Sequence, residues 1–147
     1  LDGPAGLDHL FPTPATLADG DLDALGMTGA RVTTVRGIAR ALLDGQVGFQ
    51  AEQTLDEFVA AWIALPGIGP WTAQYLALRA LGHPDAFPAE DLVLQKAVPV
   101  DGSRMGARAL RARADAWRPW RGYAVIHLWR DSMTPPAAAG PQPEQTA

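Results

Sequence analysis

The sequence predicts an all-α domain. Apolar residues recur at helical spacing over most of the chain, and segments with the alternating pattern of a strand are almost absent. Glycine and proline residues separate the periodic segments from one another. At 147 residues, of which 48% are hydrophobic, the chain has the size of one domain and can bury a core.

Roughly eight helices are expected, most of them bounded by a capping residue, a glycine or a proline. The first two are short and lie in the stretch FPTPATLADGDLDALGM, with starts at Thr13 and Asp21. The remaining six are expected over 31–43, 54–65, 71–81, 91–98, 103–117 and 120–131. Together they predict one domain over 1–133.

The ends of the chain differ from this domain in composition. The segment TPPAAAGPQPEQTA, 134–147, is expected to be a disordered tail because it has too little apolar surface to bury. The chain begins with Leu1 and shows no signal segment, so we interpret it as a fragment of a longer, cytoplasmic, bacterial protein associated with the nucleoid. No apolar run approaches the roughly 20 residues of a membrane span.

Composition excludes several kinds of site. There is no cysteine, which rules out disulfides, thiolate zinc sites and cysteine-ligated iron–sulfur clusters. The three histidines are far apart, and the net charge of −4 argues against a generic nucleic-acid binder. However, the stretch 104–130 holds seven arginines and a single acid, a formal charge of +6. A solvated helix face and a nucleic-acid contact are both open interpretations of this run.

The connection Pro66-Gly67-Ile68-Gly69-Pro70 is the most distinctive stretch. Glycine tolerates positive φ and lets another backbone approach without a Cβ in the way. Pro70 suits the first turn of the next helix, whose free amide groups and positive dipole end can bind phosphate, with Thr72 adding a hydroxyl donor. A compact turn between two core helices, closed by Ile68, is the alternative interpretation.

The longer stretch LPGIGPWTA resembles the helix–hairpin–helix motif, which grips the DNA backbone without reading sequence. With FPAEDLVLQKA, FPTPATLA, LGMTGARVTTV and WRPWRGYAVIHLW, the chain resembles the helix–hairpin–helix DNA glycosylase superfamily, and within it the DNA-3-methyladenine glycosylase II (AlkA) type. The resemblance implies that Gly67, Ile68, Gly69 and Thr72 bind DNA. It also implies that backbone carbonyl groups of Ile63, Leu65 and Ile68 hold a monovalent cation, Na⁺ or K⁺, against a phosphate.

The resemblance places the catalytic aspartate at Asp91. Trp71, Tyr75 (one helical turn further along) and Trp129 fall on aromatic side chains that line the base pocket. The family usually has tyrosine directly after the aspartate, whereas this chain has Leu92, which makes one pocket wall aliphatic. Each aromatic residue could equally be a core residue of a helical domain.

Alkylated purines have the chemistry that such a site needs. N3- or N7-alkylated purines are cationic and electron-poor, so a flipped base of this kind is attracted to indole and phenol faces. Its glycosidic bond is already weak, and the enzyme mainly needs an anion beneath the developing oxocarbenium ion. Asp91 suits that role and could also orient or deprotonate the attacking water. Glu90 is the rival acid, with a dipole-complementing role in a first helical turn as its alternative.

Superfamily members that also cut the strand carry a lysine nucleophile shortly after the hairpin. Here Trp71 occupies that place, and the only lysine, Lys96, lies behind Asp91. We therefore expect base hydrolysis without lyase activity, with no cofactor for the chemistry and no iron–sulfur cluster. Arg121 is expected either to contact DNA phosphates or to brace the Asp91 helix. The expected partner is double-stranded DNA containing alkylated bases, bound by a monomer.

Two other functions remain open at this point. A non-catalytic helix–hairpin–helix module would bind the DNA backbone without sequence specificity and would need neither Asp91 nor a pocket. An all-α protein-interaction domain would leave the hairpin and the arginine run without a role. Enzymes of the family have a sheet-containing domain and further helices before the position of FPTP. The chain is therefore expected to be a partial glycosylase domain, and the fragment could be inactive.

Overall fold

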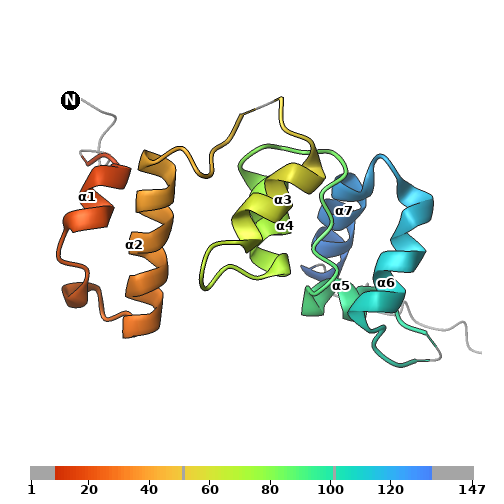
Figure 1. Cartoon of the computed structure of the whole chain (residues 1–147). Helices are drawn as coiled ribbons and strands as arrows, with labels where there is room; N and C mark the ends of the chain where they lie inside the picture. Colours follow the sequence, from red (N-terminus) through yellow and green to blue (C-terminus); the bar gives the residue numbers. More distant parts are fainter. Residues whose placement is uncertain (1–8, 51, 101, 134–147) are drawn as a thin grey trace, which may run out of the picture.

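The described part of the chain is all-α, as predicted (Figure 1). The computed structural model describes residues 9–50, 52–100 and 102–133. Over these ranges there is no named strand, and the extended pairing present is an isolated bridge between Val100 and Ser103. The predicted tail, 134–147, lies outside the described residues.

Seven α-helices and two 3₁₀ turns make up the described elements. In chain order they are α1 (Pro14–Asp19), η1 (Asp23–Leu25), α2 (Gly29–Leu43), α3 (Leu55–Ile63), α4 (Pro70–Arg79), α5 (Leu92–Ala97), α6 (Ala107–Ala114), η2 (Asp115–Trp117) and α7 (Arg121–Met133). The second expected helix is thus only a 3₁₀ turn. The segment expected to be helical from Ser103 begins at Ala107 instead, because Ser103 pairs with Val100.

Local sequence explains where several helices begin. Thr13 caps α1 as predicted, since its hydroxyl accepts the amide of Thr16 at 3.2 Å. Thr54 and Glu57 form a capping box at the start of α3, in which each side chain bonds to the backbone of the other. These caps fix where the chain enters α1 and α3 without help from the core.

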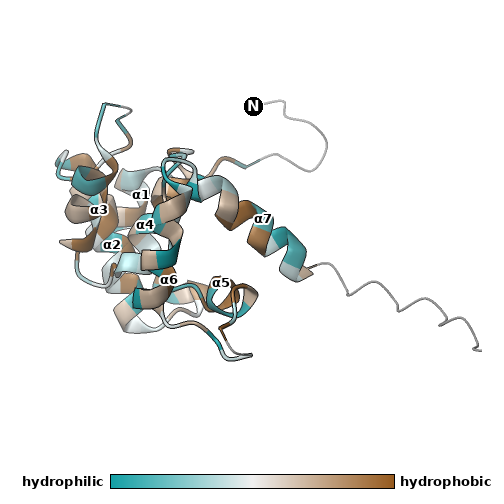
Figure 2. Cartoon of the chain, turned by 90° about the vertical axis from the view of Figure 1, so that its right-hand side faces the viewer, coloured by the Kyte–Doolittle hydropathy of each residue, from teal (hydrophilic) through white to brown (hydrophobic). Residues whose placement is uncertain are grey.

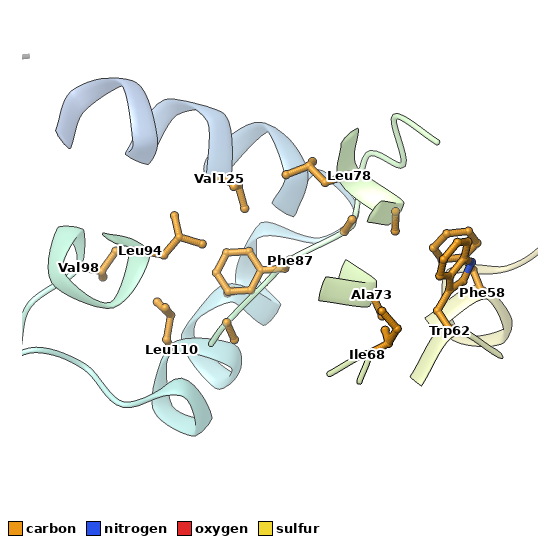
Figure 3. Packing of buried hydrophobic residues seen from close by; sticks show 14 of the residues in the cluster. Phe58, Trp62, Ile68, Ala73, Leu78, Phe87, Leu94, Val98, Leu110 and Val125 are labelled. Carbon is orange, nitrogen blue, oxygen red and sulfur yellow. The ribbon is translucent and has the colours of Figure 1, made fainter. Parts of the chain in front are cut away.

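The core lies between α3, α4, α5, α6 and α7. Figure 3 shows Phe87, Leu94, Leu110 and Val125 facing one another, beside a second group around Phe58 and Trp62. The side chains of Phe58, Leu94, Leu110 and Val125 are fully enclosed. The pair α1 and α2 lies to one side of this body in Figure 1 and joins the core through Ala41 of α2. The core thus fixes α4, α5 and α7 relative to one another.

Helix α7 is apolar in its middle and hydrophilic in its last turn, which stands clear of the other helices in Figure 2. Arg130 and Asp131 in that turn are exposed and form an ion pair at 3.7 Å. The apolar middle contributes Val125 to the core. None of the helices in the described ranges has the length and hydrophobicity required to span a membrane.

Candidate active site

The turn between α3 and α4 contains two glycines in different conformations. Gly67 has a φ of 86°, and a Cβ at this position would lie 2.1 Å from Oγ1 of Thr34 on α2. Gly69 has an ordinary extended conformation, with a φ of −98° and a ψ of 173°, and open space around its Cβ position. Between them, Ile68 is buried in the core. The fold therefore requires glycine at 67, whereas Gly69 leaves an open surface.

Helix α4 begins at this turn with an open N-terminus. Gly69 is its N-cap and Pro70 its first residue, and no side chain caps its first amide groups. Those amide groups lack intrahelical partners, and the helix dipole makes this end positive. The backbone N–H groups of Trp71 and Thr72 therefore lie at an end that suits an anion.

The carbonyl groups predicted to hold a cation flank the end of α3. Ile63 is the last residue of α3, and Leu65 and Ile68 lie in the turn that follows. Carbonyl groups at a helix end lack intrahelical donors, and carbonyl oxygens are suitable ligands for hard cations. Of these oxygens, that of Leu65 already accepts the Ile68 amide at 3.1 Å. This cation site remains a prediction.

Asp91 is the N-cap of α5, and its carboxylate receives donors from three helices. Oδ1 accepts the amide groups of Val93 at 2.9 Å and Leu94 at 3.0 Å. The indole Nε1 of Trp129 donates to the same oxygen at 3.3 Å. The indole Nε1 of Trp71 donates to Oδ2 at 3.0 Å. Helices α4, α5 and α7 therefore meet at this one carboxylate.

These contacts keep the carboxyl group of Asp91 charged. Partial burial raises its pKa, but the Leu94 amide, the Trp71 and Trp129 indole groups and the Val93 amide together outweigh burial. The net pKa of Asp91 lies below its ordinary value. A carboxylate with a lowered pKa is a persistent anion and a weak base.

Three aromatic side chains surround this anion. Trp71 and Tyr75 of α4 stack, with ring centroids 5.0 Å apart and an interplanar angle of 17°. Tyr75 in turn contacts Trp129 of α7, with centroids 6.0 Å apart. Trp71 is 39% exposed, so it is not a core residue. Leu92, directly after Asp91, is 55% exposed and leaves that side of the site open. The structure thus brings together the four residues that the resemblance placed in the pocket.

An ion-pair clamp holds the loop that leads into Asp91. Arg121, at the start of α7, is 5% exposed, and its Nε and Nη2 each lie 2.7 Å from an oxygen of Asp85. Arg118 adds a third contact to Asp85 at 2.7 Å. The amide of Gly122 donates to the carbonyl of Pro84 at 2.7 Å. The guanidinium group of Arg121 is enclosed with Asp85, in the loop before the Asp91 helix, and this position favours the expected brace over the expected phosphate contact.

Two glutamines complete the clamp, and sequence reasoning missed both. Oε1 of Gln74 on α4 accepts the Phe87 amide at 2.8 Å. The buried Gln95 on α5 donates from Nε2 to the Ala89 carbonyl at 2.9 Å. A glutamine next to an apolar helix face is the available signal, but such residues are usually solvent-exposed. The loop 85–91 is therefore tied to α4, α5 and α7 at once.

Glu90, the rival acid, points to a different helix. Its carboxylate bonds to Arg111 of α6, and its Oε2 is buried without a hydrogen-bond partner. Asp91, in contrast, carries both indole contacts. The geometry thus separates the two neighbouring acids and gives the aromatic site to Asp91.

Comparison with solved structures identifies the fold. No family model matches the chain. The fold is that of the 3-methyladenine DNA glycosylases. The enzyme of Schizosaccharomyces pombe, solved with abasic DNA, matches with a TM-score of 0.76 at 24% identity over 84% of this chain and 65% of its own. A DNA-3-methyladenine glycosidase from Bacillus halodurans matches with a TM-score of 0.72 over 84% of this chain and 61% of its own.

Curated relatives carry the match further. A probable bifunctional transcriptional activator/DNA repair enzyme AlkA from Mycobacterium tuberculosis is 41% identical over 128 residues, 87% of this chain and 26% of that protein. DNA-3-methyladenine glycosylase 2 of Escherichia coli is 35% identical over 122 residues, 81% of this chain and 42% of that protein. The resemblance to the AlkA type is thereby confirmed. The chain spans less than half the length of these relatives.

Proposed function

We propose that the chain supplies the catalytic aspartate, the base-stacking aromatics and the DNA grip of a base-excision-repair glycosylase for alkylated purines of the 3-methyladenine and 7-methylguanine class. The observation that carries this proposal is the Asp91 carboxylate, held by the indole groups of Trp71 and Trp129. A module that only binds DNA needs no anion inside an aromatic cluster. The relatives named for this activity support the same class of reaction.

The proposed reaction is hydrolysis of the glycosidic bond of a flipped nucleotide. The bond between C1′ and the base nitrogen breaks, and its electron pair leaves with the base, which turns from a cation into a neutral molecule. The carboxylate of Asp91 stabilises the positive charge that develops on the sugar. Water then adds to C1′ and loses a proton. Because its pKa is lowered, Asp91 acts mainly as a fixed anion, with a smaller part in orienting the water.

The stacking geometry limits how a base can be held. Tyr75 covers one face of the Trp71 indole at a centroid distance of 5.0 Å. A flipped base would therefore stack on the face of Trp71 that Tyr75 does not cover. The cationic ring of an alkylated purine gains most from such a contact, since the indole face is electron-rich. Leu92 adds an aliphatic contact where the family usually has tyrosine.

The hairpin supplies the proposed DNA grip. The open end of α4, with the amide groups after Gly69 and the hydroxyl of Thr72, is positioned for a phosphate of the DNA backbone. Gly67 and Ile68 shape the turn. A Na⁺ or K⁺ ion on the carbonyl groups of Ile63, Leu65 and Ile68 would add positive charge beside that phosphate. The structurally similar Schizosaccharomyces pombe enzyme was solved in complex with abasic DNA, which supports DNA as the partner.

The test is release of 3-methyladenine or 7-methylguanine from alkylated duplex DNA by the full-length protein. Asp91→Asn is compared with the wild type and with Glu90→Gln, a matched loss of the neighbouring charge. We expect release by the wild type and by Glu90→Gln, and a loss of at least about 100-fold in Asp91→Asn. Absence of release by the wild type, or equal release by Asp91→Asn, would reject the proposal.

The predicted absence of lyase activity has its own test. Lys96 lies in the last turn of α5 and is the only lysine in the chain. We expect no strand cleavage at an abasic site and no covalent adduct after borohydride reduction. The reason is that Trp71, and not a lysine, occupies the position of the lyase nucleophile next to Asp91. An adduct that disappears in Lys96→Arg would show that the enzyme is bifunctional.

A further inference from the structure

The arginine run that the sequence singles out divides into two groups in the structure. Some guanidinium groups are bound within the protein, namely those of Arg111, Arg118, Arg121 and Arg130. Others have no partner in the described part of the chain and are exposed, namely Arg104, Arg108 and Arg113. The second group is not explained by internal structure.

Arg108 and Arg113 of the second group lie on different sides of α6, whereas Arg104 precedes this helix. Leu110 and Ala114 form the buried side of this helix. Arg108 and Arg111 are three residues apart and therefore share one flank. Arg113 is about 140° around the helix from Arg108 and lies on the opposite flank. One flank thus carries an arginine pair, and the other carries a single, otherwise similar arginine.

The flank that Arg108 shares with Arg111 is the one next to the segment that contains Glu90. Arg111 bonds to Glu90, the residue before Asp91. The amide of Met105 donates to the Gln95 carbonyl at 3.0 Å, which ties the segment next to Arg104 to α5. Arg111, Arg108 and Arg104 thus follow one another from the residue next to Asp91 to the segment bonded to α5, and we call these three the arginine row. In Figure 1 α5 lies between the start of α4 and the start of α6.

The charges of Arg104 and Arg108 have no ion-pair partner among the described residues, whereas Arg111 is paired with Glu90. Between Asp101 and Asp115 the chain holds four arginines and no acid. Arg108 stands in the first turn of α6, where a positive side chain opposes the helix dipole. The N-cap residue, Gly106, has no side chain that could accept a hydrogen bond from the first amide groups of the helix. A row with this unfavourable charge suits a polyanionic partner.

We propose that Arg104 and Arg108 bind phosphate groups of the DNA, as a second contact on the side of Asp91 away from the hairpin. The inference rests on the proposed function, because it takes DNA as the partner. The hairpin offers backbone amides at one side of the flipped nucleotide, and the arginine row offers guanidinium groups at the other. Two separate contacts hold the backbone on both sides of the site and so fix the register of the flipped base.

The experiment measures binding of the full chain to undamaged duplex DNA over a range of KCl concentrations. Each phosphate contact that is lost lowers the slope of log K against log salt by about one. We expect Arg104→Gln/Arg108→Gln to lower the slope by roughly two. Arg113→Gln, which removes the same kind of charge from the opposite flank, is expected to leave the slope unchanged. Arg104→Lys/Arg108→Lys is expected to retain the wild-type slope.

The outcomes separate this inference from the proposed function. A wild-type chain that does not bind duplex DNA would reject both. Normal binding with an unchanged slope in Arg104→Gln/Arg108→Gln would reject the arginine row and leave the hairpin grip intact. An equal loss of slope in Arg113→Gln would reject it as well, because the effect would then be one of net charge. Thermal melting of each variant verifies that the helix remains folded.

Discussion

Helices α4 and α5 begin next to each other, but only α5 has a side-chain cap at its N-terminus. The start of α4 has no side-chain cap, because Gly69 and Pro70 supply none. The start of α5 is capped by Asp91, whose Oδ1 accepts the amides of Val93 and Leu94. Both ends carry the positive pole of a helix dipole. One is left for an external anion, and the other already holds an anion that belongs to the chain.

The difference assigns a task to each helix. A phosphate is attracted to the uncapped N-terminus of α4 and repelled by the Asp91 carboxylate at the N-terminus of α5. The same carboxylate is available to a sugar that develops positive charge. Trp71, in the first turn of α4, donates to Asp91 and fixes the distance between the two ends. The Trp71 indole therefore links the proposed phosphate site at the start of α4 to the proposed catalytic carboxylate at the start of α5.

The largest expected effect comes from removing the anion of α5 in two ways. Asp91→Ala removes both the charge and the cap, whereas Asp91→Asn removes the charge and keeps a good N-cap. Base release is expected to fall by at least about 100-fold in both variants. The free energy of unfolding is expected to fall by about 1 kcal/mol in Asp91→Ala alone. Urea unfolding measures this difference, and equal destabilisation in both variants would contradict the capping role.

The second effect, on stability and not on base release, is expected from breaking the clamp between Asp85 and the start of α7. Asp85→Asn leaves the buried Arg121 guanidinium with only the longer contact to Asp115, at 3.8 Å, and we expect a loss of about 3 kcal/mol in unfolding free energy. Burial raises the pKa of Asp85, but the hydrogen bonds and charges of Arg121 and Arg118 outweigh burial and lower it.

The sign of this shift sets the pH dependence. A lowered pKa in the folded state stabilises the protein above the unfolded pKa of about 3.9, and this stabilisation is lost as pH falls through the folded value. The difference between wild type and Asp85→Asn should therefore be full at pH 7 and shrink below about pH 4. Urea unfolding at several pH values measures it. A difference that does not change with pH would contradict the ion-pair origin.

Cutting the link between the two helix starts should have a milder result. Trp71→Phe keeps an aromatic face for the base but removes the donor to Oδ2 of Asp91. We expect release to fall roughly tenfold, the size of one hydrogen bond to a charged group. Loss of this donor raises the pKa of Asp91 toward its ordinary value, so the acidic limb of the rate profile should move to higher pH. Tyr75→Phe, which has no bond to Asp91, is the control for the profile.

Much of this site could be predicted from the sequence, because its residues lie in recognisable stretches. The positions of Asp91, Trp71, Tyr75 and Trp129 followed from motifs, and Tyr75 also from helical spacing. Local spacing does not predict which residues pair when they are far apart in the sequence. The pair of Asp85 and Arg121 is an example, since its members are 36 residues apart. Nothing in the arginine run distinguishes Arg121, which is buried, from the arginines around it.

The hairpin glycines illustrate the same limit at close range. In sequence Gly67 and Gly69 are equivalent members of one motif. In the structure Gly67 has positive φ and packs against Thr34 of α2, a contact that only the tertiary fold creates. Gly69 has neither constraint. The reason for glycine at 69 therefore lies outside the fold of this chain, in whatever approaches the start of α4.

The smallest expected effect comes from giving α4 an N-cap carboxylate like that of α5. Gly69→Asp fits the observed backbone, with a φ of −98° and open space at Cβ. An N-cap carboxylate is expected to raise unfolding free energy by a few tenths of a kcal/mol relative to glycine. The same carboxylate would occupy the amides proposed for phosphate, so the affinity for undamaged duplex DNA should fall several-fold.

Gly69→Asn separates the two reasons for that loss, because it caps the helix without adding charge. We expect an intermediate affinity for Gly69→Asn, a weaker one for Gly69→Asp, and melting temperatures at or slightly above the wild type for both. Gly67→Ala, in contrast, should lower the melting temperature, since its Cβ would meet Thr34. If Gly69→Asp bound DNA as the wild type does, the open end of α4 would not be the phosphate site, and the difference between the two helix starts would have a purely structural origin.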